Sequence, residues 1–293
     1  MLKVLITGAS GFIGKNLAES FASRYAIHAP NSSELNLLDA HVVRDYLAAG
    51  KFDVVVHSAT TRSNRSLGAP PDMLDRNCRM FFSLARNQHL FGKMIHFGSG
   101  AEYDRRNLPP HVTEDYFDTS VPADPYGFSK YICSMYAESQ EKILNLRLFG
   151  VFGKYEAWEV RFISNACARV ACGLPIVIRQ NVIFDYLYVN DLTKITAWFI
   201  ENTPSRRVFN VCSGKGRDLR HLADIVAAAS GRNPEIGVCN PGLALEYTAD
   251  NSRLLREMPN FQFEPIEQSI NELYHWYDEH RTTLDPAMLR YDG

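Results

Sequence analysis

Several features that mark special classes of protein are absent from this sequence. No apolar run in its 293 residues approaches the ~20 residues that a membrane-spanning helix needs. Residues 2–6 follow Met1 directly and are too short for the apolar core of a signal peptide. We therefore expect a cytoplasmic protein that has no membrane partner.

An excess of charge of one sign is absent as well. The formal net charge is -2, and the lysines and arginines are scattered without a basic run. A chain with so little net charge does not attract polyanions, so nucleic acid is not an expected partner.

The cysteines lack the spacing of a metal or redox site. All six lie far apart within apolar segments, with no C-x-x-C pair and no His-Cys cluster. We expect them to be reduced packing residues, and we expect no bound metal.

A large folded core is indicated by what is present, since 46% of the residues are hydrophobic and 22% are charged. The chain opens with a β-rich run at residues 2–7, a turn that contains Gly8, Gly11 and Gly14, and an amphipathic helix. Such glycines let the backbone approach a pyrophosphate, and the start of the helix supplies free N–H groups. This pattern predicts dinucleotide binding, and the alternative is a tight turn without a ligand.

Apolar strands and amphipathic helices alternate as far as residue 149, which predicts an α/β fold with a parallel sheet. The strands are expected at residues 2–7, 25–29, 52–56, 94–97 and 143–149, with a helix capped by Asp39 and another over residues 72–89. Ser58, Ala59 and Thr60 follow the third strand, where small residues would let a cofactor pass.

The second strand lacks the acidic residue that would bind the hydroxyls of an adenosine ribose. It ends in Pro30, Asn31 and Ser32 instead. Without a carboxylate to repel a 2′-phosphate, NADP(H) is favoured. NAD(H) stays possible because no arginine is present to attract that phosphate, and Asn31 or Ser32 would then bind the ribose. The alternative for these residues is a surface turn.

Tyr126 and Lys130 are four residues apart, which places both on one face of a helix. A cation held ~4 Å from a phenol favours its ionised form and prepares it for acid/base work. Ser99 follows the fourth strand, where ligands of such sheets bind, and it could hold a substrate carbonyl against Tyr126. The alternatives are a shared helix surface and a turn serine.

Elements become shorter after residue 153. A helix is expected at about residues 160–172, strands near 176–178 and 186–189, and further helices at 191–200, 219–229 and 266–280.

These motifs together resemble the extended short-chain dehydrogenase/reductases, in the branch that acts on nucleotide-sugars. The resemblance rests on residues 7–14, 57–60, Ser99 four residues before Tyr103, Tyr126 with Lys130, and residues 147–153, 184–192 and 208–211. Residues 34–39 are particularly similar to the GDP-fucose synthases.

The resemblance implies a Rossmann domain and a smaller C-terminal α/β domain that binds substrate. Residues 1–154 with 185–213 would form the first, and residues 155–184 with 214–293 the second. Ser99, Tyr126 and Lys130 would be catalytic, and the protein would be a homodimer. The cofactor contacts that it implies are Gly8, Ser10, Gly11, Phe12, Ile13, Gly14, Asn31, Ser32, Asn36, Leu37, Ser58, Ala59, Thr60, Asn77, Tyr126 and Lys130, with Asn36 and Leu37 at the adenine.

On the substrate side the sequence departs from the family. Gly150 stands for the usual Asn and Phe184 for the usual Arg, two positions that in many relatives touch the substrate pyrophosphate. Arg161 and Arg179 could replace those contacts, unless both are surface arginines. Ser99, Gly100 and Gly150 are the other expected substrate contacts.

The resulting hypothesis is an NADPH-dependent reductase of a 4-keto-6-deoxy nucleotide-sugar, with GDP as the favoured nucleotide. GDP-fucose synthases epimerise with a Cys and a His, and the matching positions are Ala101 and Arg161 here. We expect reduction without epimerisation, although Glu102 and Tyr103 lie close enough in sequence to substitute. The alternatives are a 4-epimerase or dehydrogenase with bound NAD, and a non-catalytic dinucleotide-binding regulator.

Overall fold

A six-stranded parallel sheet forms the centre of the computed structural model, which describes residues 1–61 and 70–289. The strands lie in the order β2 (Ala26–His28), β1 (Lys3–Thr7), β3 (Val54–His57), β4 (Lys93–Ser99), β5 (Ile143–Leu148) and β9 (Val208–Val211). The chain runs outward from β1 to β2 and then crosses back to β3. The carboxyl ends of β1 and β3 therefore flank the topological switch point, where such sheets bind ligands.

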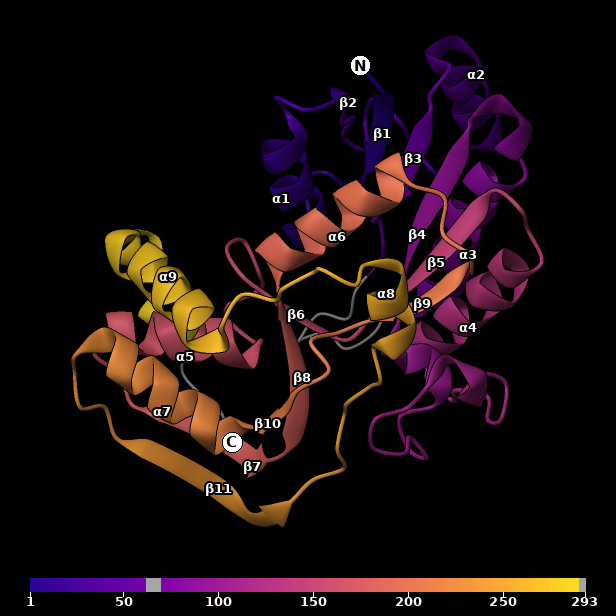
Figure 1. Cartoon of the computed structure of the whole chain (residues 1–293). Coiled ribbons are helices and arrows are strands. Elements are labelled where there is room, and N and C mark those ends of the chain that lie inside the picture. The colour runs from indigo at the N-terminus through magenta and orange to yellow at the C-terminus, as the bar shows by residue number, and fades with distance from the viewer. Residues whose placement is uncertain (62–69, 290–293) are drawn as a thin grey trace.

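Helices cover both faces of this sheet because alternate strand residues point to opposite sides. On β1, Val4 and Ile6 belong to one core together with α1 (Phe12–Phe21) and α6 (Val189–Glu201). Leu5 belongs to the other core, which α2 (Ala40–Gly50), α3 (Met73–Ala85) and α4 (Pro125–Glu138) cover. The predicted doubly wound α/β fold is confirmed, and Figure 1 shows the two layers.

Local chemistry sets the ends of these helices. Asp39 accepts hydrogen bonds from the main-chain N–H groups of His41 and Val42, so the predicted cap of α2 is confirmed. The prediction of one helix over residues 72–89 is wrong at its end, because α3 stops at Ala85. Asn87 donates back to the Ser83 carbonyl, and a separate 3-10 turn, η1 (Gln88–Leu90), follows.

Two smaller sheets lie beyond the central one. β6 (Gly150–Phe152), β8 (Ile183–Tyr188) and β10 (Gly216–Asp218) form the first, and β7 (Ile176–Asn181) pairs with β11 (Ile236–Leu243) in the second. The long strand β11 was not predicted. The helices of this part are α5 (Phe162–Ala171), α7 (Leu219–Ser230), α8 (Ser252–Glu257) and α9 (Ile266–Glu279).

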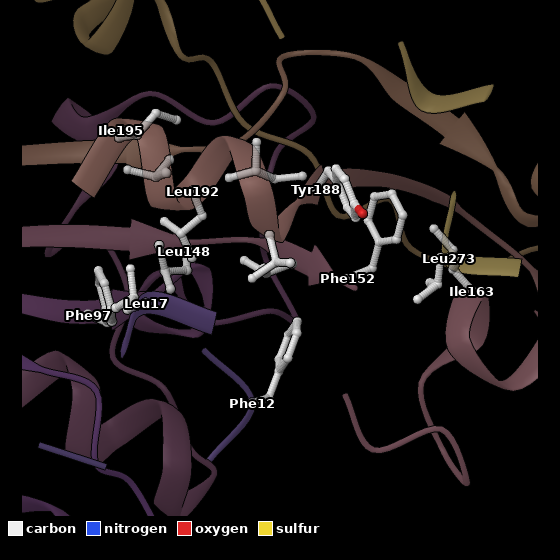
Figure 2. Packing of buried hydrophobic residues seen from close by; sticks show 14 of the residues in the cluster. Phe12, Leu17, Phe97, Leu148, Phe152, Ile163, Tyr188, Leu192, Ile195 and Leu273 are labelled. Atoms are coloured by element: carbon white, nitrogen blue, oxygen red, sulfur yellow. The ribbon is translucent and has the colours of Figure 1, made fainter. Parts of the chain in front are cut away.

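One apolar core joins the central sheet to the smaller sheets. Figure 2 shows Phe12, Phe97 and Leu148 near the central sheet and Phe152 and Tyr188 further along the same cluster, which continues to α5 and α9. The two parts of the chain are thus packed together. The domain boundaries expected at residues 154, 184 and 213 stay a prediction.

Two expectations about special residues can be compared with the structure. Within residues 1–61 and 70–289, no helix is long and apolar enough to cross a membrane. The cysteines carry no disulfide in the described part of the chain, but Cys239 is exposed on β11. The expectation that every cysteine is a packing residue is wrong for Cys239.

Candidate active site

The glycine turn between β1 and α1 packs directly against the end of β3. Gly8 has a φ of +74°, and a Cβ built there would lie 2.7 Å from the main chain of Ala59. A Cβ at Gly14 would lie 2.3 Å from the Gly8 carbonyl oxygen. Ser58 donates to the Thr7 carbonyl at 2.8 Å, which ties the two strand ends together. Both glycines are therefore required for this close approach at the switch point.

The first turn of α1 is open to an anion. Gly11 caps the helix without a side chain, so its first N–H groups, at Phe12, Ile13 and Gly14, have no side-chain acceptor. Ser10 is exposed beside them, whereas the Phe12 side chain is buried in the core and offers only its main chain. The residues present thus fit the pyrophosphate of a dinucleotide.

The loop after β2 contains a carboxylate after all. The Asn31 amide oxygen accepts from the main-chain N–H groups of Ser33 and Glu34, and the Glu34 carboxylate accepts from the Asn31 N–H at 2.8 Å. Ser32 is exposed. No acid follows β2 directly, as expected, but the turn brings the Glu34 carboxylate to the Asn31 N–H, and the expectation that no carboxylate is available to repel a 2′-phosphate stays a prediction.

Asn36 and Leu37 occupy the next turn. The Asn36 amide oxygen accepts from the Leu38 N–H at 3.1 Å, and the Leu37 side chain is buried among the residues that α2 and α3 cover. Their predicted contact with the adenine stays a prediction.

Asn77 connects the loop after β3 to the helix that carries Tyr126. Its amide oxygen accepts from the Thr61 N–H at 2.7 Å and lies 3.4 Å from the Thr60 hydroxyl. Its amide nitrogen donates to the Ser129 hydroxyl, which in turn donates to the Tyr126 carbonyl at 2.7 Å. These bonds tie the loop after β3 to the first turn of α4, and the predicted cofactor contact of Asn77 stays a prediction.

The predicted catalytic residues come from β4 and α4, which approach each other closely. A Cβ at Gly127 would lie 2.8 Å from the Ala101 carbonyl, so α4 begins directly against the turn η2 (Gly100–Tyr103) that follows Ser99. Lys130 donates to the Phe97 carbonyl at 2.8 Å, and its ammonium lies 6.0 Å from the centre of the Tyr126 ring. Two further protons of this ammonium remain for the phenol or for a cofactor.

The two histidines whose pKa values the Lys130 charge affects, His57 and His96, are neutral. Burial lowers the pKa of His57 to about 3 and lowers the pKa of His96 well below its usual value, with the Lys130 charge as a further cause. Thr7 holds His57 through a contact of 2.8 Å between Thr7 Oγ1 and His57 Nδ1. Both rings are therefore uncharged at neutral pH.

A buried polar network lies under Ser99. The Glu102 carboxylate accepts from the Ser99 N–H at 2.9 Å and from Arg147 Nε at 2.6 Å. The side chains of Glu102 and Arg147 are 0% exposed. We call the connected group the polar floor, and it consists of Glu102, Ser134, Glu138, Asn145 and Arg147.

The polar floor engages two residues whose roles the sequence left open. One Glu102 carboxylate oxygen accepts from the Ser99 N–H and the other from Arg147 and Asn145, and the Tyr103 hydroxyl is buried between Asn210 at 2.6 Å and Arg147 at 3.0 Å. Burial also raises the pKa of Tyr103. The expectation that either residue could substitute in epimerisation is therefore wrong.

The substrate side is lined by aromatic rings. A Cβ at Gly150 would lie 2.5 Å from the Phe184 ring, and a Cβ at Gly100 would lie 2.5 Å from the Tyr247 hydroxyl. The Tyr247 hydroxyl thus lies beside the residue that follows Ser99. Arg161 is exposed at the start of α5.

Arg179 is not brought to these residues by any contact. It is exposed on β7 and faces away from Gln180, its neighbour on the strand, which lines a groove beside Tyr247.

The sequence did not predict that Tyr247 and Arg105 would lie on the predicted substrate side, near Ser99. The Arg105 guanidinium lies 4.6 Å from the centre of the Tyr247 ring. Nothing in the sequence pairs them, because they come from loops far apart in the chain. The only local signal was that Arg105 follows Ser99 closely.

The fold, the open glycine turn and the helix with Tyr126 and Lys130 define an NAD(P)-dependent oxidoreductase of the extended short-chain type. The chain belongs to the NAD dependent epimerase/dehydratase family, which matches residues 4–212.

Comparisons with individual proteins agree with this family. An ADP-L-glycero-D-manno-heptose-6-epimerase of Cupriavidus pinatubonensis is 24% identical over 263 residues, which cover 77% of each chain. The structure of a GDP-L-fucose synthetase from Naegleria fowleri bound to NADP is similar with a TM-score of 0.84 at 17% identity, over 96% of this chain and 94% of that one. A GDP-mannoheptose C4 reductase from Campylobacter jejuni with NADP bound has a TM-score of 0.79 at 18% identity, over 94% and 98%. These two structural likenesses concern the fold.

Proposed function

We propose that this chain reduces a 4-keto-6-deoxy nucleotide-sugar, with GDP as the favoured nucleotide, and leaves the carbons beside the ketone unchanged. The bound nicotinamide supplies the hydride. Tyr126 gives the carbonyl oxygen its proton, Ser99 holds that oxygen, and Lys130 tunes the phenol and binds the nicotinamide ribose.

The observation that carries this proposal is the contrast between Tyr126 and its neighbours. Tyr126 is half-buried, whereas Glu102 and Tyr103 are fully enclosed in or beside the polar floor. Epimerisation would need a second acid/base pair at the sugar carbons. Ala101 has no proton to exchange, Arg161 stays charged, and burial raises the pKa of Tyr247. The described residues thus support reduction alone.

For the cofactor we propose NADP(H). No carboxylate follows β2 directly, and the one that the loop supplies, on Glu34, is turned back onto the Asn31 N–H. We further propose a homodimer, which light scattering would test. We also propose a reducing, cytoplasmic setting, and thiol titration of purified protein would test whether the cysteines are reduced.

The reaction is tested in D₂O. The protein, NADPH and a 4-keto-6-deoxy sugar linked to GDP, dTDP, CDP or UDP are incubated, and the product is examined by NMR beside a sample without protein. We expect a C4 alcohol with no deuterium at C3 or C5. Enzyme-dependent deuterium there would refute reduction without epimerisation. No reduction of any of the four ketones would favour a 4-epimerase or dehydrogenase with bound NAD, which conversion of the corresponding 4-hydroxy sugars would then reveal.

A further inference from the structure

Four aromatic rings form a continuous surface beside Ser99. The ring centres of Phe184 and Tyr186 are 4.8 Å apart, those of Phe184 and Tyr247 are 4.8 Å apart, and those of Tyr247 and Phe149 are 4.9 Å apart. We call Phe149, Phe184, Tyr186 and Tyr247 the aromatic wall. None of these four side chains is positively charged, so a phosphate bound beside the wall needs a cation from a neighbouring residue.

Arg105 lies at that edge with its hydrogen-bonding capacity unused. Its guanidinium stacks on Tyr247 at 4.6 Å from the ring centre, and within residues 1–61 and 70–289 it makes no hydrogen bond and no ion pair. The next residue, Arg106, gives two hydrogen bonds to the Asp104 carboxylate at 2.8 and 2.9 Å. Two consecutive arginines therefore differ, since one is satisfied within the protein and the other is not.

A groove of about 600 Å³ connects Arg105 to the wall. It is lined by Arg105, Arg106, Gln180, Leu243, Ala244, Leu245, Glu246 and Tyr247. Its carboxylate, on Glu246, accepts from the Thr248 hydroxyl at 2.6 Å and lies 4.0 Å from His111. The groove thus offers a free guanidinium next to a carboxylate that already has polar partners.

Tyr247 separates this groove from the catalytic serine by the length of one side chain. Its ring meets Arg105, while its hydroxyl would lie 2.5 Å from a Cβ at Gly100, the residue that follows Ser99. A sugar held by Ser99 would therefore have its phosphate end within reach of Arg105.

Arg161 supplies a second positive charge at the wall. Burial raises the pKa of Tyr186 overall, while the charges of Arg161 and Arg105 both act to lower it. Arg161 also makes no ion pair within the described part of the chain.

We propose that Arg105, held against Tyr247, binds the diphosphate of the substrate. This inference rests on the proposed nucleotide-sugar substrate. A guanidinium offers paired N–H donors that match phosphate oxygens, and stacking on an aromatic ring orients them without using them. The aromatic wall then contacts the sugar, and the groove selects the nucleoside beyond the diphosphate.

The test measures binding by calorimetry on protein saturated with NADPH, so that a free diphosphate cannot enter the cofactor site. GDP, UDP, dTDP and CDP are compared with their nucleosides. We expect Arg105→Ala to weaken the tightest diphosphate by about 10- to 100-fold and to leave nucleoside binding unchanged. Arg105→Lys should be intermediate, because a point charge replaces the fork. Arg206→Ala, at an exposed arginine that does not line the groove, is the matched control and should change the dissociation constant by less than about threefold.

Two variants of Tyr247 separate the stacking from the hydroxyl. Tyr247→Phe keeps the ring under Arg105 and should retain diphosphate binding, whereas Tyr247→Leu should lose part of it. An equal loss in Arg105→Ala and Arg206→Ala would overturn the assignment, and so would weaker NADPH binding in Arg105→Ala. If the unaltered protein binds a diphosphate that Arg105→Ala binds equally well, this inference fails and the proposed substrate stands. If the unaltered protein binds none of the four, both fail.

Discussion

The polar floor and the aromatic wall meet at Ser99, and each contains or borders one prominent arginine. Arg147 in the floor is fully buried and contacts Glu102 and Glu138 at 2.6 Å. Arg105 at the wall is exposed and stacks on the Tyr247 ring, and it makes no ion pair within residues 1–61 and 70–289. The first has its charge neutralised by the fold, whereas the second keeps its donors for something outside the fold.

This difference separates two tasks. A buried ion pair is costly to form but very costly to break, so it holds the Ser99 turn in one geometry. An exposed arginine contributes little to stability, and its contacts can therefore be chosen by the ligand. We infer that the floor positions the chemistry while the wall and its arginines select the substrate.

The largest expected effect comes from breaking the floor. Glu102→Ala leaves the buried Arg147 without its innermost acceptor and should lower the free energy of unfolding by about 3–5 kcal/mol. Glu138→Ala removes the other carboxylate of the same arginine, which is 38% exposed, and should cost about 1 kcal/mol. Urea denaturation of both variants measures the difference. If both variants lose the same free energy of unfolding, the buried Glu102 contributes no more to stability than the partly exposed Glu138, and the contrast between buried and exposed ion pairs would be wrong.

The next effect concerns the residue between the two regions. Tyr126→Phe keeps the ring and removes the proton donor, so turnover should fall by at least ~100-fold while the NADPH dissociation constant stays within about twofold. Tyr136→Phe, on the same helix but packed against Phe82, is the control and should leave turnover unchanged. Retained turnover in Tyr126→Phe would remove this residue from the mechanism.

The structural elements on the predicted cofactor side could be predicted from the sequence, because each depends on residues that are close together in the chain. Gly8 and Gly14 follow a strand and open a helix, Asp39 precedes its helix by one position, and Tyr126 and Lys130 share one helical face. Each pattern spans a few residues and has a direct geometric meaning. The structure places these elements where the sequence predicted them, within a few residues at each end.

The contacts on the predicted substrate side could not be predicted in this way. Tyr247 and Arg105 come from distant loops, and no periodicity links them. The position of the Glu34 carboxylate was not predicted, because the turn around Asn31 sets it and the strand does not. Glu102 looked available because the sequence does not show that Arg147 on β5 would bury and bind it. In each case the decisive contact is tertiary.

The smallest expected effect extends the comparison to the exposed loop after β2. Glu34→Gln removes a negative charge but keeps an oxygen to accept from the Asn31 N–H. If that charge lies near the position of a 2′-phosphate, the variant should bind NADPH about two- to fivefold more tightly relative to NADH. The gain should shrink in 1 M salt, because exposed charges are screened there.

Asp45→Asn removes an exposed carboxylate on α2 and should leave the ratio of the two dissociation constants unchanged. A ratio that is identical in Glu34→Gln and the unaltered protein would place Glu34 away from the ribose. If the unaltered protein binds NADH more tightly than NADPH, the proposal of NADP(H) is wrong. Glu34 would then play the part of the acidic residue that is missing from the end of the second strand.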